Sequence, residues 1–144
     1  MKIKLLIFMA LIFVSGLMAC KSKQSTTTTV QNPQEITGKQ WKLIEINGQT
    51  VDSKAFILLN QAESRISGTG GCNTLSGSFE QSAPARIRFS QVVVTQKACI
   101  ATNYDNELAK VLEMTDNYSL SADGSRLSLN RARMAPLAVF GIEK

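Results

Sequence analysis

The chain has 144 residues, of which 44% are hydrophobic, and a formal net charge of +5 from 16 basic and 11 acidic residues. It contains no histidine, which excludes Ser-His-Asp and Cys-His nucleophiles, imidazole metal sites and histidine-based pH switches. The basic residues are scattered rather than clustered, so the composition also argues against nucleic-acid binding.

The first twenty residues have the pattern of an export signal. Two lysines precede an apolar run, residues 5–14, which is too short to cross a bilayer because about 20 apolar residues are needed. Residues 17–20, Leu-Met-Ala-Cys, resemble the lipobox of bacterial lipoproteins, in which the cysteine is acylated, for example with palmitate. We therefore expect residues 1–19 to be a lipoprotein signal peptide and Cys20 to be the lipid anchor. An ordinary signal peptide followed by an incidental cysteine is the alternative.

The segment after Cys20 is polar and almost free of large apolar side chains. We expect residues 20–37 to be a flexible tether, because such a sequence cannot bury a core. Residues 38–144 are then long enough for one domain of ordinary size. No aspartate follows Cys20 directly, whereas an aspartate there retains lipoproteins of enteric-type bacteria at the inner membrane. The expected location is therefore the outer membrane, facing the periplasm.

The domain begins with sequences typical of short β-strands. Alternating or β-branched apolar residues recur between turn-forming residues. Asn47-Gly48 and Asp123-Gly124 are dipeptides typical of tight hairpins. The predicted strands are residues 40–46, 56–59, 65–68, 76–80, 85–89, 92–95, 118–122, 126–129 and 136–140.

One segment has the periodicity of an amphipathic helix instead. Its apolar residues recur at i, i+4, i+7 and i+8 and would form one stripe. We expect the helix to end near residues 114–117, and Thr102 with Asp105 resembles a capping box at its start. The stripe consists of Tyr104, Leu108, Val111 and Leu112.

These elements predict a mainly β fold of the α+β class. Short strands joined by hairpins, with one α-helix, favour an antiparallel sheet that curls into a partial or closed β-barrel.

Cys72 and Cys99 are the two thiols that remain after lipidation. An even pair in a small exported domain favours a disulfide, which would stabilise the fold by about 3–4 kcal/mol in the chain-entropy model. Two buried free thiols are the alternative. A metal site is less favoured because neither cysteine has a CxxC partner or a histidine nearby.

A series of short motifs follows one order along the chain: Trp41, Leu43, Asn47-Gly48, Ser67-Gly68, Gly71-Cys72-Asn73, Gly77, Thr95-Gln96-Lys97-Ala98-Cys99, Glu107, Leu112, Leu127 and Leu129. This order resembles the META (HslJ-like) domain family over residues 38–142. Lys97 departs from the family, which often has methionine there, and this weakens the idea of an apolar patch at that place. The resemblance implies a small β-rich, barrel-like fold with one helix, and members linked to stress responses and the cell envelope without an agreed enzymatic activity.

The glycine-rich loop at residues 69–73 is the most unusual segment. Such loops can bind phosphate through backbone N–H groups, so Asn73 is a candidate binding residue. The segment matches neither a P-loop nor a dinucleotide-binding motif, however. Glycines that allow a bulge beside a paired cysteine are the favoured explanation.

Four further residues are candidates for chemistry, each with a simpler structural explanation. Trp41 could stack on a ligand but is more often a core or rim residue. Arg86 and Arg88 share one strand face and could bind an anionic partner, or could simply be solvated. Glu107 lacks a second acid placed to pair with it, and favours a structural role at the helix start.

The sequence therefore predicts a monomeric, membrane-anchored envelope lipoprotein that is not an enzyme. We expect it to bind an envelope protein or a cell-wall component in a stress or maintenance role, without metal or cofactor. The alternative is a periplasmic small-ligand binder that uses a lipocalin-like barrel mouth.

Overall fold

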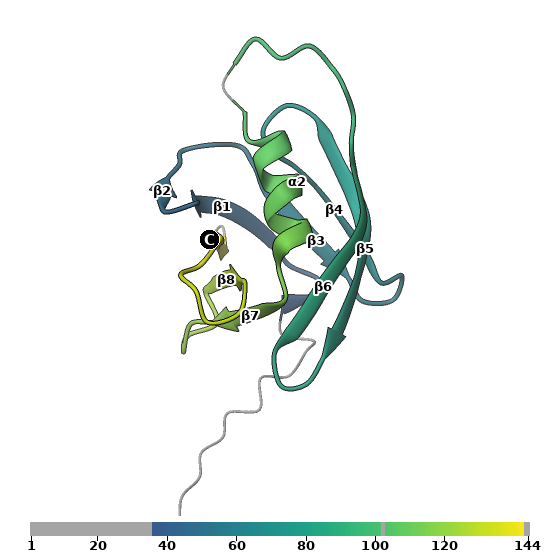
Figure 1. The fold of residues 1–144 in the computed structure, drawn as a ribbon. Helices are drawn as coiled ribbons and strands as arrows, with labels where there is room; N and C mark the ends of the chain where they lie inside the picture. The colour runs from purple at the N-terminus through teal and green to yellow at the C-terminus, as the bar shows by residue number, and fades with distance from the viewer. Residues whose placement is uncertain (1–35, 102, 143–144) are drawn as a thin grey trace, which may run out of the picture.

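A computed structural model describes residues 36–101 and 103–142 (Figure 1). The predicted signal peptide, Cys20 and Thr102 lie outside the described residues. Within the described residues, no helix has both the length and the apolar character that crossing a membrane requires. The elements are β1 (Gln40–Ile46), β2 (Gln49–Thr50), β3 (Phe56–Asn60), β4 (Arg65–Thr69), β5 (Thr74–Ser82), β6 (Arg86–Val94), α2 (Asp105–Met114), β7 (Asn117–Leu120), β8 (Arg126–Asn130) and β9 (Ala138–Ile142).

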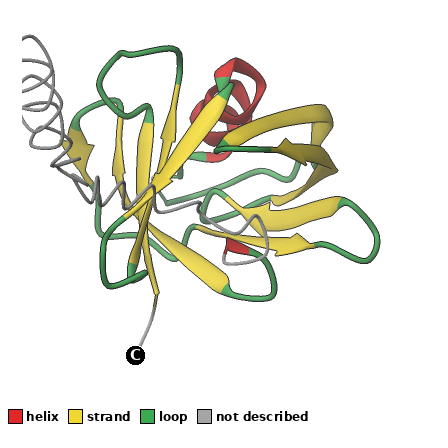
Figure 2. Ribbon diagram, turned by 90° about the horizontal axis from the view of Figure 1, so that it is seen from below, coloured by secondary structure: helices red, strands yellow, loops and turns green. Residues whose placement is uncertain are grey.

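Eight of the strands form a closed antiparallel barrel, which confirms the predicted fold class (Figure 2). β1 and β3 to β9 pair in chain order, and β9 returns to pair with β1. β2 pairs with β1 alone, in a hairpin whose turn residues Asn47 and Gly48 have φ values of 50° and 78°. Positive φ at both positions is the geometry of the type I′ turn that the dipeptide predicts.

Strand β6 is continuous, although the sequence predicted two strands on either side of residues 90–91. The pairing of β5 with β6 shifts register between Ser76 and Ser78, because β6 carries one more residue than β5 at this point. Gln91 lies there and has a φ of 52°. The interruption seen in the sequence is thus a β-bulge within one strand and not a turn between two.

The inward-facing side chains fill the barrel. Trp41 and Phe140 are the largest fully buried residues, and they belong to one continuous core with residues of every barrel strand. Helix α2 contributes Leu108, Val111 and Leu112 to the same core, so the predicted apolar stripe is confirmed.

The domain begins earlier than the predicted boundary at residue 38. Ile36 is fully buried, and its carbonyl oxygen accepts a hydrogen bond of 2.8 Å from Trp41 Nε1. Ile36, near the end of the predicted tether, therefore belongs to the core. A single isoleucine in a polar segment did not signal this, although its hydrogen-bond partner Trp41 is only five positions away.

Candidate functional site

Trp41 is a core residue, in accord with the simpler of its two explanations. Its side chain is fully buried and its indole N–H is already donated to Ile36. The ring is therefore enclosed by the protein and does not present a surface on which an external ligand could stack.

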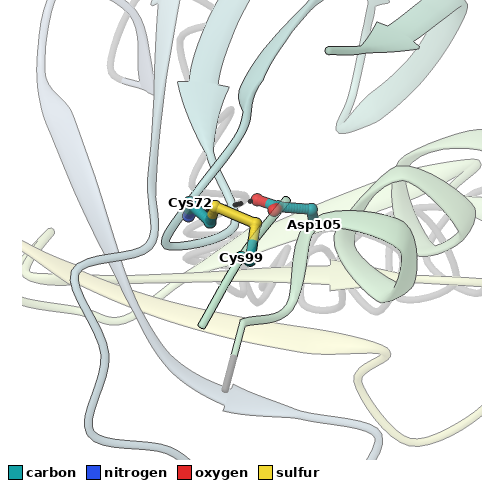
Figure 3. A group of neighbouring side chains, drawn as sticks. All are labelled: Cys72, Cys99 and Asp105. Atoms are coloured by element: carbon teal, nitrogen blue, oxygen red, sulfur yellow. Dashed lines mark hydrogen bonds between the residues drawn. A yellow bond between two sulfur atoms is a disulfide. The ribbon is translucent and has the colours of Figure 1, made fainter. Parts of the chain in front are cut away.

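Cys72 and Cys99 form the predicted disulfide (Figure 3). Their Cα atoms are 6.1 Å apart, and the bond joins the glycine-rich loop after β4 to the long connection between β6 and α2. Figure 3 shows the carboxylate of Asp105, the first residue of α2, pointing toward this bond. We call Gly70, Cys72, Asn73, Cys99 and Asp105 the Asp105 junction.

Asp105 supplies the negative charge at the glycine-rich loop. One carboxylate oxygen, Oδ1, accepts the backbone N–H of Gly70 at 2.8 Å, with Cys72 N at 3.5 Å. The other, Oδ2, accepts the backbone N–H and the side-chain Nδ2 of Asn73 at 2.9 and 3.0 Å. The residue is 3% exposed. The N–H groups that a bound phosphate would require are thus already occupied by a carboxylate of the same chain.

The side chain of Asn73 is used entirely inside the protein. Its Nδ2 donates to Asp105 and, at 3.3 Å, to Cys99 Sγ. Its Oδ1 accepts from Thr95 Oγ1 at 2.9 Å and from the backbone N–H of Lys97 at 2.7 Å. Asn73 therefore connects two loops to the start of α2, and its placement is that of a structural residue.

Gly70 is required by the close approach of α2. A Cβ atom at this position would overlap the backbone of Asp105 and Tyr104. The carbonyl oxygen of Gly70 also accepts a hydrogen bond of 2.7 Å from Tyr104 N. The glycine thus permits the helix to begin against the loop, which is the role that glycines have at tight backbone contacts.

The predicted capping box is not the arrangement at the helix start. The N-cap is Tyr104, which makes no side-chain cap hydrogen bond, and Asp105 is the first helical residue. Because the Asp105 carboxylate accepts donors from the distant loop, it is not turned back toward its own helix. Local sequence suggested a local partner for this aspartate, and the tertiary fold supplied a distant one. Glu107 is an exposed acidic residue in the first turn of the same helix.

The ligand atoms of Cys72, Cys99 and Asp105 lie within 4.8 Å of one another, which is close enough to consider a metal. A sulfur in a disulfide is not a thiolate ligand, and Asp105 already accepts several hydrogen bonds. The chemistry of this set is that of a cross-linked structural junction.

A second polar region lies where β6 meets β7. These strands share one paired position in the barrel, Arg86 opposite Asn117. Beside it is a hollow of about 480 Å³ whose lining includes Arg86, Asp116 and Arg133. A smaller hollow of about 260 Å³, also lined by Asp116, adjoins Arg88. We call Arg86, Arg88, Asp116, Arg131 and Arg133 the arginine seam.

Both arginines predicted from the sequence lie in this seam and are exposed. The sequence did not indicate Arg131 and Arg133, because they belong to the loop between β8 and β9, far along the chain. The sequence does show two arginines separated by one residue in that loop. Their position beside β6, however, is visible only in the fold.

Asp116 holds the parts of the seam together through hydrogen bonds. Its Oδ1 accepts the backbone N–H of Ala132 at 2.9 Å and the Nδ2 of Asn117 at 2.5 Å. These hydrogen bonds, followed by the positive charges of Arg86 and Arg131, lower the pKa of Asp116 below its ordinary value of 3.8. The carboxylate thereby holds the loop that carries the two later arginines against the start of β7.

A family model for the META domain matches residues 34–144. The chain belongs to the META domain family. The match spans the whole barrel and confirms the family resemblance seen in the sequence. No curated protein matches the chain.

Two solved structures share the fold of this META domain. One is the NMR structure of a protein from Burkholderia xenovorans, with a TM-score of 0.58 and 17% identity over 76% of this chain and 85% of that chain. The other is the crystal structure of a DUF4847 family protein from Bacteroides vulgatus, with a TM-score of 0.58 and 14% identity over 78% of this chain and 99% of that chain. At these identities the likeness concerns the fold alone.

Proposed function

We propose that this META domain protein is a lipoprotein of the cell envelope, anchored through Cys20 in the outer membrane and facing the periplasm. Its domain is not an enzyme and acts by binding another envelope component in a stress or maintenance role. The anchor is supported by the lipobox-like residues 17–20 and the polar segment that follows them.

The packed interior of the barrel is the observation that favours binding at the outer surface. Trp41, Leu43, Ile57, Leu75 and Phe140 are fully buried members of one core cluster in the barrel. A lipocalin-like binder needs an apolar cavity in this place. The packed interior therefore favours recognition by exposed side chains over the alternative of a ligand within the barrel.

Metabolic labelling with a palmitate analogue tests the anchor. We expect label on the native protein and on a Ser22→Ala control, and none on the Cys20→Ser variant, because only Cys20 stands at the lipobox position. A Cys20→Ser protein that still takes up label would contradict the proposal.

Site-specific photo-crosslinking in growing cells tests the binding role. A crosslinking residue is placed at Arg133 in the seam or at Leu58, an exposed residue on β3. We expect one position to give a discrete adduct that the other does not, because a partner covers one face. Failure of both positions to give an adduct, with the lipid anchor intact, would count against a binding role at these surfaces.

A further inference from the structure

The hollow beside the β6–β7 pairing combines an apolar wall with charged groups. Pro84, Ala85 and Ala132 contribute the apolar part of its lining, and Arg86 and Arg133 contribute guanidinium groups. Its volume of about 480 Å³ lies within the range of small-ligand pockets. Convergent charged groups beside apolar surface are what a ligand with one charged group and a small body requires.

The charges at this hollow do not balance. Arg86 and Arg131 both act on Asp116, and Arg133 lines the same hollow. Arg86 and Arg133 against Asp116 give the lining of the hollow a formal charge of +1. Arg131 does not line the hollow but acts on Asp116, and counting it raises the local formal charge to +2. In the part of the chain that the structure describes, no hydrogen bond or ion pair of these three guanidiniums is present.

The single carboxylate is already committed to the fold. Asp116 Oδ1 accepts from Ala132 N and Asn117 Nδ2, so this acid fixes the loop of Arg131 and Arg133 beside β6. The guanidinium donors remain for a ligand. Planar guanidiniums bind oxyanions in a bidentate manner, and several of them favour a phosphate group.

We propose that the hollow at the arginine seam is a binding site for a phosphate monoester with a small neutral body. Such a group carries a charge of about −1.5 to −2 at pH 7, which matches the local charge better than a carboxylate does. The apolar wall of Pro84, Ala85 and Ala132 then contacts the esterified part of the ligand. This inference rests on the proposed function, because it names the chemistry that the outer surface recognises.

Titration of the detergent-solubilised lipoprotein with glycerol 3-phosphate tests the site. The NMR signals of the Ala132 backbone amide and the Asn117 side-chain amide report on binding, since both residues line the hollow. We expect saturable shifts at these two groups, and weaker binding of glycerate, which replaces the phosphate with a carboxylate.

Arg86→Gln and Arg133→Gln should each weaken binding of glycerol 3-phosphate by about tenfold, because each removes a charge-assisted hydrogen bond. Arg65→Gln is the matched control, because Arg65 is an exposed arginine on β4. Asp116→Asn should strengthen binding, since it removes the opposing charge and keeps an acceptor for Ala132.

Three outcomes would overturn the proposal. They are the absence of shifts at millimolar glycerol 3-phosphate, unchanged binding by both glutamine variants, and equal binding of glycerate.

Nanodiscs with phosphatidic acid distinguish the source of the phosphate. If a lipid headgroup fills the hollow, the two amide signals shift without added glycerol 3-phosphate. If a soluble ester fills it, they shift only on addition of that ester. Either result supports the site. The mass of the N-terminal lipopeptide reports on the anchor separately, so a failed anchor and a failed phosphate site are distinguishable.

Discussion

The Asp105 junction and the arginine seam are two polar regions of one barrel that differ in how their polar groups are satisfied. At the junction, one buried carboxylate accepts hydrogen bonds from a loop that is also held by a disulfide. At the seam, one partly exposed carboxylate stands among exposed arginines beside a hollow. The first region satisfies its polar groups within the chain and stabilises the fold. The second leaves cationic donors at the surface and is therefore the region able to bind something else.

Asp105→Ala should have the largest effect on stability. It removes the acceptor of four buried or partly buried donors, and we expect a loss of about 3–5 kcal/mol in the free energy of unfolding. Chemical denaturation measures this loss. Glu107→Ala is the control on the same helix turn, since Glu107 is exposed, and it should change stability by less than about 0.5 kcal/mol. Equal effects of the two variants would show that buried Asp105 contributes no more to stability than an exposed acid on the same helix turn.

Loss of the disulfide should rank second. Replacing Cys72 and Cys99 together with serine removes a cross-link between residues 27 positions apart, and we expect a loss of about 3 kcal/mol. Denaturation of the native protein with and without reductant gives the same comparison without mutation. If neither treatment lowers stability, the hydrogen bonds of Asp105 and Asn73 alone hold the junction.

Gly70→Ala should destabilise the fold by about 2 kcal/mol, because the added Cβ overlaps backbone atoms that cannot move freely. Gly141→Ala is the matched control in β9, where the nearest atom to an added Cβ, Ile44 Cγ2, is 3.8 Å away. Thermal unfolding compares the two. Similar stability of both variants would show that the start of α2 can shift away from the loop.

Acid should affect the seam through Asp116. Because the pKa of Asp116 is lowered in the folded protein, its ionised form stabilises the seam above pH 3.8, and this contribution is lost as the pH falls through the lower folded value. We expect a carboxyl NMR titration midpoint below 3.8 for Asp116. Asn117→Ala should raise that midpoint, since it removes one donor, and should leave unchanged the titration of Asp123, whose pKa is lowered by Ser121 and Ser125. If Asn117→Ala leaves the midpoint unchanged, the lowered pKa of Asp116 is caused by groups other than the Asn117 side chain.

The smallest effect on stability is expected from the seam arginines. Arg86→Gln and Arg133→Gln should each change the free energy of unfolding by less than about 0.5 kcal/mol, because exposed charges contribute little to stability. Chemical denaturation checks this. A large loss in either variant would make the seam a structural region like the junction and would weaken its assignment as a binding surface.

The sequence by itself determined the local elements and the covalent cross-link. Residue alternation located the strands, Asn47-Gly48 fixed the type I′ turn, and the stripe from Tyr104 to Leu112 located α2. These features depend on neighbours within a few residues. The disulfide followed from the presence of two thiols in a domain that the sequence predicts to be exported.

Only the tertiary structure decided the partners of the polar residues. The donors that Asp105 accepts come from a loop more than 30 positions earlier, and Arg133 meets Arg86 only because the barrel places the loop after β8 next to β6. Barrel closure creates these contacts between segments remote in the sequence, and no local pattern of residues encodes which distant donor or charge will lie opposite.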